Sequence, residues 1–222
     1  MEQLGQVTGE LAIYHNFAIQ MWMGKLPYKD FFPEYPPLAM PFFWFAQLFG
    51  TQWFTLLWYT EVFFAIFFLS LLIYKLRGNP YIFLAVIFPL EGLLWDRYDI
   101  FPALFTFGSL YLAKSKRFFP AAFLLGIGTL IKIYPILLLP VIFFWQYQYF
   151  PTVKKLFYTL FFFLIPFFII LGIILGYGGK KGLIKFAEFQ GKRGIMLESI
   201  RAMPIILEGK RRPTYQHNTY EF

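Results

Sequence analysis

Residues 156–176 read LFYTLFFFLIPFFIILGIILG, 21 consecutive positions without a charged side chain. A helix that crosses the hydrocarbon core of a bilayer needs roughly 20 predominantly apolar residues. The stretch meets that length, and Thr159 and Tyr158 are its most polar members. We therefore predict a transmembrane helix here, and the rest of the chain is interpreted around it.

Further apolar runs precede this helix, and they predict an all-α, polytopic transmembrane bundle with about six spans. The run at 53–74 is long enough for a perpendicular crossing, whereas the middle four are short. Asp96 to Asp99 and Lys114 to Arg117 interrupt them, so they cannot merge into longer spans. We interpret them as short or tilted helices that snorkelling Lys and Arg side chains extend. The middle runs are 80–95, 100–113, 118–131 and 133–147.

The composition excludes several classes of protein. Of the 222 residues, 59% are hydrophobic, 24% aromatic and only 14% charged, so lipid rather than water must face most of the chain. The absence of cysteine excludes disulfides, thiolate catalysis and Cys-type metal sites. The net charge of +8 could attract any polyanion, but in a chain this apolar we expect membrane lipids and phosphate-bearing substrates, not nucleic acid.

The distribution of charge predicts the orientation in the cell membrane. The connectors near 75–79, 114–117 and 148–155 carry Lys and Arg but no acid, so the positive-inside rule places them in the cytoplasm. Every acidic residue except Glu61 then falls on the other side. Residues 36–50 must form a helix on the outer surface, because a further span would invert all later loops. A second outer helix is expected from about Glu10 to Met23, before Gly24.

The first outer loop contains residue types suited to sugar chemistry. It reads GKLPYKDFFPEYPP over residues 24–37, and it combines Asp30 and Glu34 with Tyr28 and Tyr35. Carboxylates act as general bases in sugar transfer, and Glu10 upstream adds a third. The alternative is a solvated loop whose tyrosines anchor at the lipid headgroups. Residue types alone do not decide between the two.

Several motifs, in order along the chain, resemble the GT-C type membrane glycosyltransferases. The most similar family is that of the polyprenyl-phosphate-mannose-dependent α-mannosyltransferases (glycosyltransferase family 87). The motifs are Tyr14 followed by GKLPYKDF at 24–31 and EYPPL at 34–38, then RYD at 97–99, KIYP at 132–135 and RGIMLES at 193–199. They extend from about residue 10 to the end of the chain.

The resemblance implies a hexosyltransferase that uses a polyprenyl-phosphate sugar as donor, with mannose the expected sugar. The acceptor would be a hydroxyl of a glycan or glycolipid, on the periplasmic or extracellular face. The family's base is an Asp four residues before a Tyr; Glu10 occupies that place here, and Asp30 and Glu34 are the other candidates. No cofactor is expected, and a metal is possible although nothing in the sequence demands one. The expected substrate-binding residues are Tyr14, Tyr28, Tyr35, Arg97, Asp99, Lys132, Arg193 and Glu198.

Other interpretations stay open at this point. Arg97 and Asp99 could serve in structural ion pairs, and Lys132 could snorkel. A multi-pass transporter or lipid flippase would also use aromatic spans and buried acids, although it predicts charges along a midplane pathway. We expect one membrane-embedded domain over 1–222, with outer loops at 1–52 and 177–222 and helices at 53–176. Because family members begin with a span, the chain would be incomplete at both ends, and an inactive fragment is a third interpretation.

Overall fold

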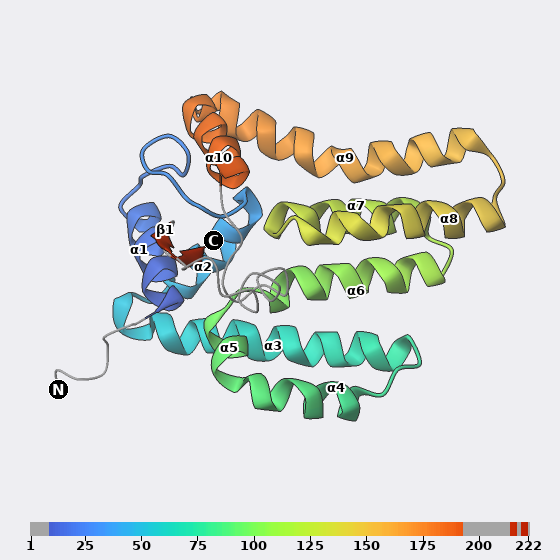
Figure 1. Cartoon of the computed structure of the whole chain (residues 1–222), viewed down its shortest axis with the longest axis horizontal. Helices are drawn as coiled ribbons and strands as arrows, with labels where there is room; N and C mark the ends of the chain where they lie inside the picture. Colours follow the sequence, from blue (N-terminus) through green and yellow to red (C-terminus); the bar gives the residue numbers. More distant parts are fainter. Residues whose placement is uncertain (1–8, 193–213, 217–218, 222) are drawn as a thin grey trace.

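The computed structural model describes residues 9–192, 214–216 and 219–221, and these residues are mainly helical (Figure 1). A short antiparallel pair of strands, β1 (Thr214–Gln216) and β2 (Thr219–Glu221), accompanies the helices. The helices are α1 (Glu10–Trp22), α2 (Met40–Ala46), α3 (Phe54–Lys75), α4 (Pro80–Ile87), α5 (Glu91–Asp96), α6 (Ile100–Lys114), α7 (Phe118–Ile131), α8 (Leu139–Tyr149), α9 (Val153–Gly176) and α10 (Lys180–Lys192). Short 3-10 segments are η1 (Pro37–Ala39), η2 (Thr51–Trp53), η3 (Phe88–Leu90) and η4 (Tyr134–Leu138).

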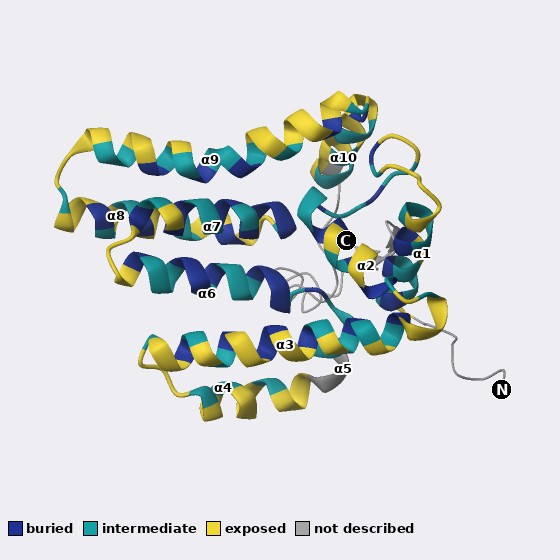
Figure 2. Ribbon diagram, turned by 180° about the vertical axis from the view of Figure 1, so that it is seen from behind, coloured by how far each residue is buried: buried dark blue, intermediate teal, exposed yellow. Residues whose placement is uncertain are grey.

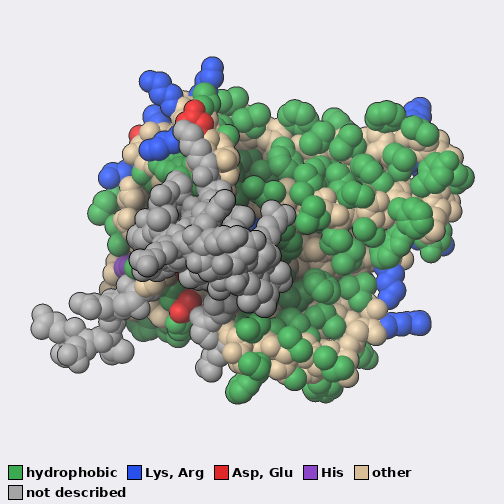
Figure 3. Space-filling model, in the orientation of Figure 1, with side chains coloured by type: hydrophobic (Ala, Val, Ile, Leu, Met, Phe, Trp, Pro, Cys, Tyr) green, Lys and Arg blue, Asp and Glu red, His purple; other side chains and the backbone are tan. Residues whose placement is uncertain are grey.

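The long helices lie side by side and form a bundle (Figure 1). In sequence order, α3 packs against α6, α6 against α7 and α7 against α9. Helices α1, α2 and α10 gather at one end together with the loop 24–37, and we call this the loop end. The connectors 76–79, 115–117 and 150–152 lie at the other end, which we call the basic end because Lys and Arg side chains gather over it (Figure 3).

Two helices among the described residues are long and apolar enough to cross a membrane. They are the continuous segment Thr51–Lys75 and helix α9 (Val153–Gly176). At 1.5 Å per residue, the 24 residues of α9 span about 36 Å, more than the roughly 30 Å of a hydrocarbon core. Their outer faces expose large apolar side chains such as Phe63, Phe161 and Phe168 (Figure 2). This surface indicates association with a membrane.

Most element boundaries agree with the sequence-based expectations. Helix α1 covers the predicted segment from about Glu10 to Met23, and Gly24 follows it with a φ of 80°. Helix α2 has only seven residues, too few to cross a bilayer. The expected outer loop at 177–222 contains α10 and the two strands, and its side of the membrane stays a prediction. Four lysines lower the hydropathy of α10, so a search for apolar runs cannot find it.

Small residues let the bundle helices approach closely. A Cβ added at Gly126 of α7 would overlap the carbonyl oxygen of Phe163 in α9 and lie 3.3 Å from Cγ of Pro166. The Ser109 hydroxyl of α6 donates a 2.7 Å hydrogen bond to the carbonyl of Ala121 in α7. Close backbone contact through Gly, Ser and Ala is typical of helices that pack in lipid.

Four helices end in the same hydrogen-bonded turn, but its central residue differs between the two ends of the bundle. At the loop end, α1 and α9 turn through Gly24 (φ 80°) and Gly178 (φ 89°). At the basic end, α3 and α6 turn through Arg77 (φ 67°) and Lys116 (φ 60°). In each turn the amide of this residue and the next amide bond to carbonyls three and five residues back. This is the Schellman arrangement, whose left-handed position usually takes glycine.

Candidate active site

A cavity of about 300 Å³ opens at the loop end. Its walls come from α1, the loop 24–37, the connector between α5 and α6, the segment after α7, and α10. The lining residues are Glu10, Glu34, Tyr35, Pro36, Arg97, Tyr98, Asp99, Lys132, Ile133, Tyr134 and Gln190. Six of them are candidates from the sequence, contributed by segments up to 122 positions apart (132 minus 10). Folding therefore brings together motifs that are scattered along the chain.

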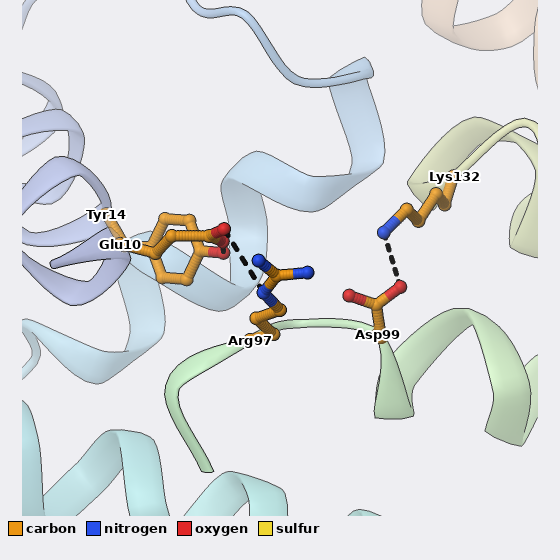
Figure 4. A network of polar contacts seen from close by, with 5 residues as sticks. All are labelled: Glu10, Tyr14, Arg97, Asp99 and Lys132. Atoms are coloured by element: carbon orange, nitrogen blue, oxygen red, sulfur yellow. Dashed lines mark hydrogen bonds and ion pairs between the residues drawn. The ribbon is translucent and has the colours of Figure 1, made fainter. Parts of the chain in front are cut away.

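Glu10 stands at the start of α1, and both of its carboxylate oxygens have a partner (Figure 4). Oε1 lies 3.2 Å from Nε of Arg97. The hydroxyl of Tyr14, one helical turn later, donates a 2.6 Å hydrogen bond to Oε2. Because each carboxylate oxygen can accept two hydrogen bonds, the group is oriented without losing its capacity to accept a proton.

Tyr14 is fully buried and fixes the position of this carboxylate. Its ring stacks on Phe43 of α2 at a centroid distance of 4.3 Å and meets the edges of Tyr35 (5.5 Å) and Tyr98 (5.9 Å). Burial raises the pKa of Tyr14 far above its ordinary value, and the nearby Tyr35 and Glu10 raise it further. The phenol therefore stays protonated, as a hydrogen-bond donor must.

A second ion pair joins Asp99, before α6, to Lys132, after α7 (Figure 4). The Lys132 ammonium also lies 5.0 Å from the centroid of the Tyr98 ring. The two side chains are 37% and 44% exposed, and exposed pairs contribute only about 0–1 kcal/mol to stability. The pair is thus too weak to hold the bundle together. Its effect is to keep a cation oriented at the wall of the cavity, where an anionic ligand could displace Asp99.

The sequence left open whether Arg97 and Asp99 form structural ion pairs. Each does form an ion pair, with a partner from another part of the chain: Arg97 with Glu10, and Asp99 with Lys132. Both pairs line the same cavity. The segment 97–99 thus places a cation and an anion side by side between α1 and α7.

Tyr28 and Asp30 lie outside this cavity and shape the loop 24–37. The Asp30 carboxylate is exposed and accepts a 2.8 Å hydrogen bond from the amide of Leu26. Tyr28 is buried, and its hydroxyl donates a 2.6 Å hydrogen bond to the carbonyl of Tyr35. Burial raises the pKa of Tyr28, so this donor also remains protonated. Neither side chain is placed to touch a ligand beside Glu10, whereas Glu34 is part of the wall.

Helix α10 holds the loop 24–37 in place, a role that sequence reasoning missed. The Tyr177 hydroxyl, just before α10, donates to the carbonyl of Pro27 at 2.9 Å. Near the other end of the helix, Gln190 donates from Nε2 to the carbonyl of Glu34 at 2.9 Å. At Gly182 a Cβ would come within 2.6 Å of the Tyr28 carbonyl carbon, so only glycine fits. The spacing of Phe186, Phe189 and Gln190 on one helical face was the available signal.

Two predicted substrate contacts, Arg193 and Glu198, lie outside the described residues. Within the described ranges, no three His, Asp or Glu side chains gather closely enough to hold a metal ion. The described cavity therefore offers carboxylates, guanidinium, ammonium and aromatic rings as its functional groups. These groups can transfer protons, neutralise a phosphate and stack on a sugar ring.

Comparison with known proteins adds no relative to this description. No protein-family model matches the chain, and no curated protein or solved structure matches it either.

Proposed function

We propose that the chain is a multi-pass protein of the cell membrane, with the cavity on the outer face. Helices α4 to α8 would cross as short or tilted spans between α3 and α9. Their side-by-side packing with those two helices supports this arrangement. So does the placement of the cation-rich connectors, which are gathered at the end away from the cavity.

On this basis we propose a glycosyltransferase that moves a sugar, with mannose the expected one, from a polyprenyl-phosphate donor to a hydroxyl of a glycan or glycolipid. The observation that carries the proposal is one cavity that combines an oriented carboxylate, Glu10, with two cations, Arg97 and Lys132. A general base and a phosphate-binding cation are the two groups that such a transfer needs. Tyr35 and Tyr134 supply aromatic faces on the same wall.

In the proposed reaction Glu10 takes the proton of the acceptor hydroxyl. The acceptor oxygen forms a bond to the anomeric carbon as the bond from that carbon to the phosphate oxygen breaks. The electron pair of the broken bond stays on the lipid phosphate, whose added charge Lys132 and Arg97 neutralise. Both cations are held by carboxylates in the unliganded protein, so the phosphate must compete with Asp99 and Glu10 for them.

Replacing Glu10 tests the proposal. Glu10→Gln keeps the shape and the hydrogen bond from Tyr14 but cannot take the proton, so sugar transfer should fall by about 10²–10⁴-fold. Glu10→Asp should retain appreciable activity. Asp30→Asn is the matched control, because it also removes one loop-end carboxylate while keeping an acceptor for the Leu26 amide. The measurement is transfer of radiolabel from polyprenyl-phosphate mannose in membranes that contain each variant.

Two results would contradict the proposal. Normal turnover by Glu10→Gln together with an inactive Asp30→Asn would move the role of base to Asp30. Direct transfer from a nucleotide sugar, with synthesis of the lipid donor blocked, would overturn the donor class. Protein level and thermal midpoint are measured for every variant, so that misfolding is not mistaken for lost chemistry.

A further inference from the structure

A second cavity, of about 380 Å³, lies at the basic end, away from the candidate active site. Three of its lining side chains are cations and none is an acid. It is lined by Lys116, Arg117, Phe118, Phe119, Pro120, Gln146, Phe150 and Lys155. The nearby connectors 76–79, 115–117 and 150–152 contain no acidic residue. An anionic group entering this cavity would meet only positive charge.

Aromatic rings, rather than carboxylates, hold two of these cations. The Lys116 ammonium lies 4.5 Å from the centroid of the Tyr149 ring, and the Lys155 ammonium lies 3.6 Å from that of Phe150. Within the described residues, no carboxylate lies at ion-pair distance from Lys116, Arg117 or Lys155. The rings orient the ammonium groups and leave their charge uncompensated, in contrast to Arg97 and Lys132 at the loop end.

One lining residue of the cavity, Gln146, is buried and held in place by hydrogen bonds. Gln146 of α8 is 1% exposed, and both the nitrogen and the oxygen of its side-chain amide form hydrogen bonds. Nε2 donates to the carbonyl of Lys155 at 3.3 Å, and Oε1 accepts a 2.6 Å hydrogen bond from the hydroxyl of Thr159. These bonds fix the first turn of α9 against α8, and they set the backbone position from which Lys155 reaches the cavity.

The backbone at Lys116 gives an independent indication that its cation is needed. This residue sits in the left-handed position of the turn after α6, with φ 60°. A non-glycine residue there costs on the order of 1 kcal/mol, and glycine occupies the equivalent position after α1 and α9. A residue other than glycine in this strained conformation is a reason to look for a role of its side chain.

We propose that this cavity binds the phosphate headgroup of an anionic phospholipid from the leaflet at the basic end. The phosphate would lie among Lys116, Arg117 and Lys155, and Phe119 would contact the upper acyl chain. A lipid is favoured over a free anion because the cavity joins its cations to aromatic walls beside the exposed apolar surface of α9. This inference rests on the membrane location alone and not on the proposed sugar transfer.

The test compares two anion sources and one neutral lipid on the purified protein in detergent. Short-chain phosphatidylglycerol, short-chain phosphatidylcholine and inorganic phosphate are titrated separately, and binding is followed by native mass spectrometry and by the thermal midpoint. Phosphatidylglycerol should bind at least about fivefold more tightly than phosphatidylcholine. The choline ammonium of phosphatidylcholine offsets its phosphate charge, whereas each protein cation near a net-negative headgroup contributes about 1 kcal/mol. Inorganic phosphate should give no stabilisation at the same concentration.

Single-charge variants locate the site. Arg117→Gln and Lys155→Gln should each weaken phosphatidylglycerol binding about fivefold, and the double variant about 30-fold. Lys154→Gln is the matched control: it removes the same charge one residue away, but Lys154 does not line the cavity. The Lys155 carbonyl keeps its bond to Gln146 in these variants, and midpoints without lipid verify folding.

Three outcomes would overturn the inference. An equal loss in Lys154→Gln would mean diffuse attraction to the whole basic end. Equal affinity for phosphatidylcholine would mean that the net negative charge of the lipid does not matter. Equal stabilisation by inorganic phosphate would make the cavity a site for free anions.

Discussion

At the loop end, α1 and α9 turn through Gly24 and Gly178, whereas at the basic end α3 and α6 turn through Arg77 and Lys116. The same backbone geometry therefore takes the unstrained residue on one side of the bundle and a strained cation on the other. The loop end needs the turn only to reverse the chain. At the basic end the same turn also carries a cation, in a backbone conformation that costs on the order of 1 kcal/mol for a residue other than glycine.

The cations of the two ends also differ in whether a carboxylate offsets their charge. Those of the candidate active site lie against Glu10 and Asp99, so their charge is offset, and in the proposed reaction a phosphate would replace these carboxylates. Those of the basic cavity lie over Tyr149 and Phe150, where their charge persists. Paired cations suit a site that a substrate enters and leaves, whereas uncompensated cations suit a lasting contact with a charged surface.

The largest expected effect concerns the side of the membrane on which each end lies. The chain contains no cysteine, so single cysteines can be introduced without background. Asp30→Cys at the loop end should react fully with a membrane-impermeant thiol reagent applied outside intact cells. Arg77→Cys and Lys154→Cys at the basic end should react only after the membrane is opened; all three positions are exposed. Labelling of 77 with protection of 30 would invert the assignment.

A smaller effect is expected where α10 meets the loop 24–37. Gly182→Ala places a methyl group against the backbone of Tyr28, so it should lower the free energy of unfolding by roughly 1–3 kcal/mol and reduce sugar transfer. Gly191→Ala is the control in the same helix, because a Cβ there meets nothing within 4 Å. Thermal midpoints and transfer rates are compared, and phosphatidylglycerol binding at the basic end should not change. Similar results for both variants would show that α10 does not hold the loop.

The smallest effect tests the helix turns themselves. Lys116→Gly should raise the free energy of unfolding by up to about 1 kcal/mol in lipid-free detergent, because it relieves the left-handed backbone at the basic end. Gly178→Lys should lower it by a similar amount at the loop end, where a Cβ meets no neighbour within 4 Å. Thermal midpoints measure both changes. Destabilisation by Lys116→Gly would mean that its contact with Tyr149 outweighs the backbone strain.

The elements with strong local signals could be predicted from the sequence. Asp96 to Asp99 and Lys114 to Arg117 interrupt the apolar runs, and the helices break at those places. Gly24 marked the end of α1 because only its left-handed conformation closes the turn cheaply. How many helices cross the membrane stays a prediction, since two are long and apolar enough by themselves.

The partners within the candidate site could not be predicted, for a physical reason. Periodicity and hydropathy describe neighbours along one helix, whereas Glu10 meets Arg97, and Asp99 meets Lys132, through the packing of distant helices. The motifs indicated which residues to consider. They did not indicate that the Asp30 carboxylate would accept a hydrogen bond from the Leu26 amide. Helix α10 was overlooked because its four lysines interrupt any apolar run, and its contacts with the loop 24–37 come from residues distant in sequence.

The hydrogen bonds from Tyr177 to Pro27 and from Gln190 to Glu34 connect residues 150 and 156 positions apart. During synthesis the loop must therefore wait for the last described helix before it reaches its final form. At roughly 5–20 residues per second, the delay is on the order of 10 s. For most of that time only the helices up to α8 are available to pack, and the cavity beside Glu10 lacks the wall that α10 supplies. The cavity is therefore complete only after α10, the last described helix, has been made.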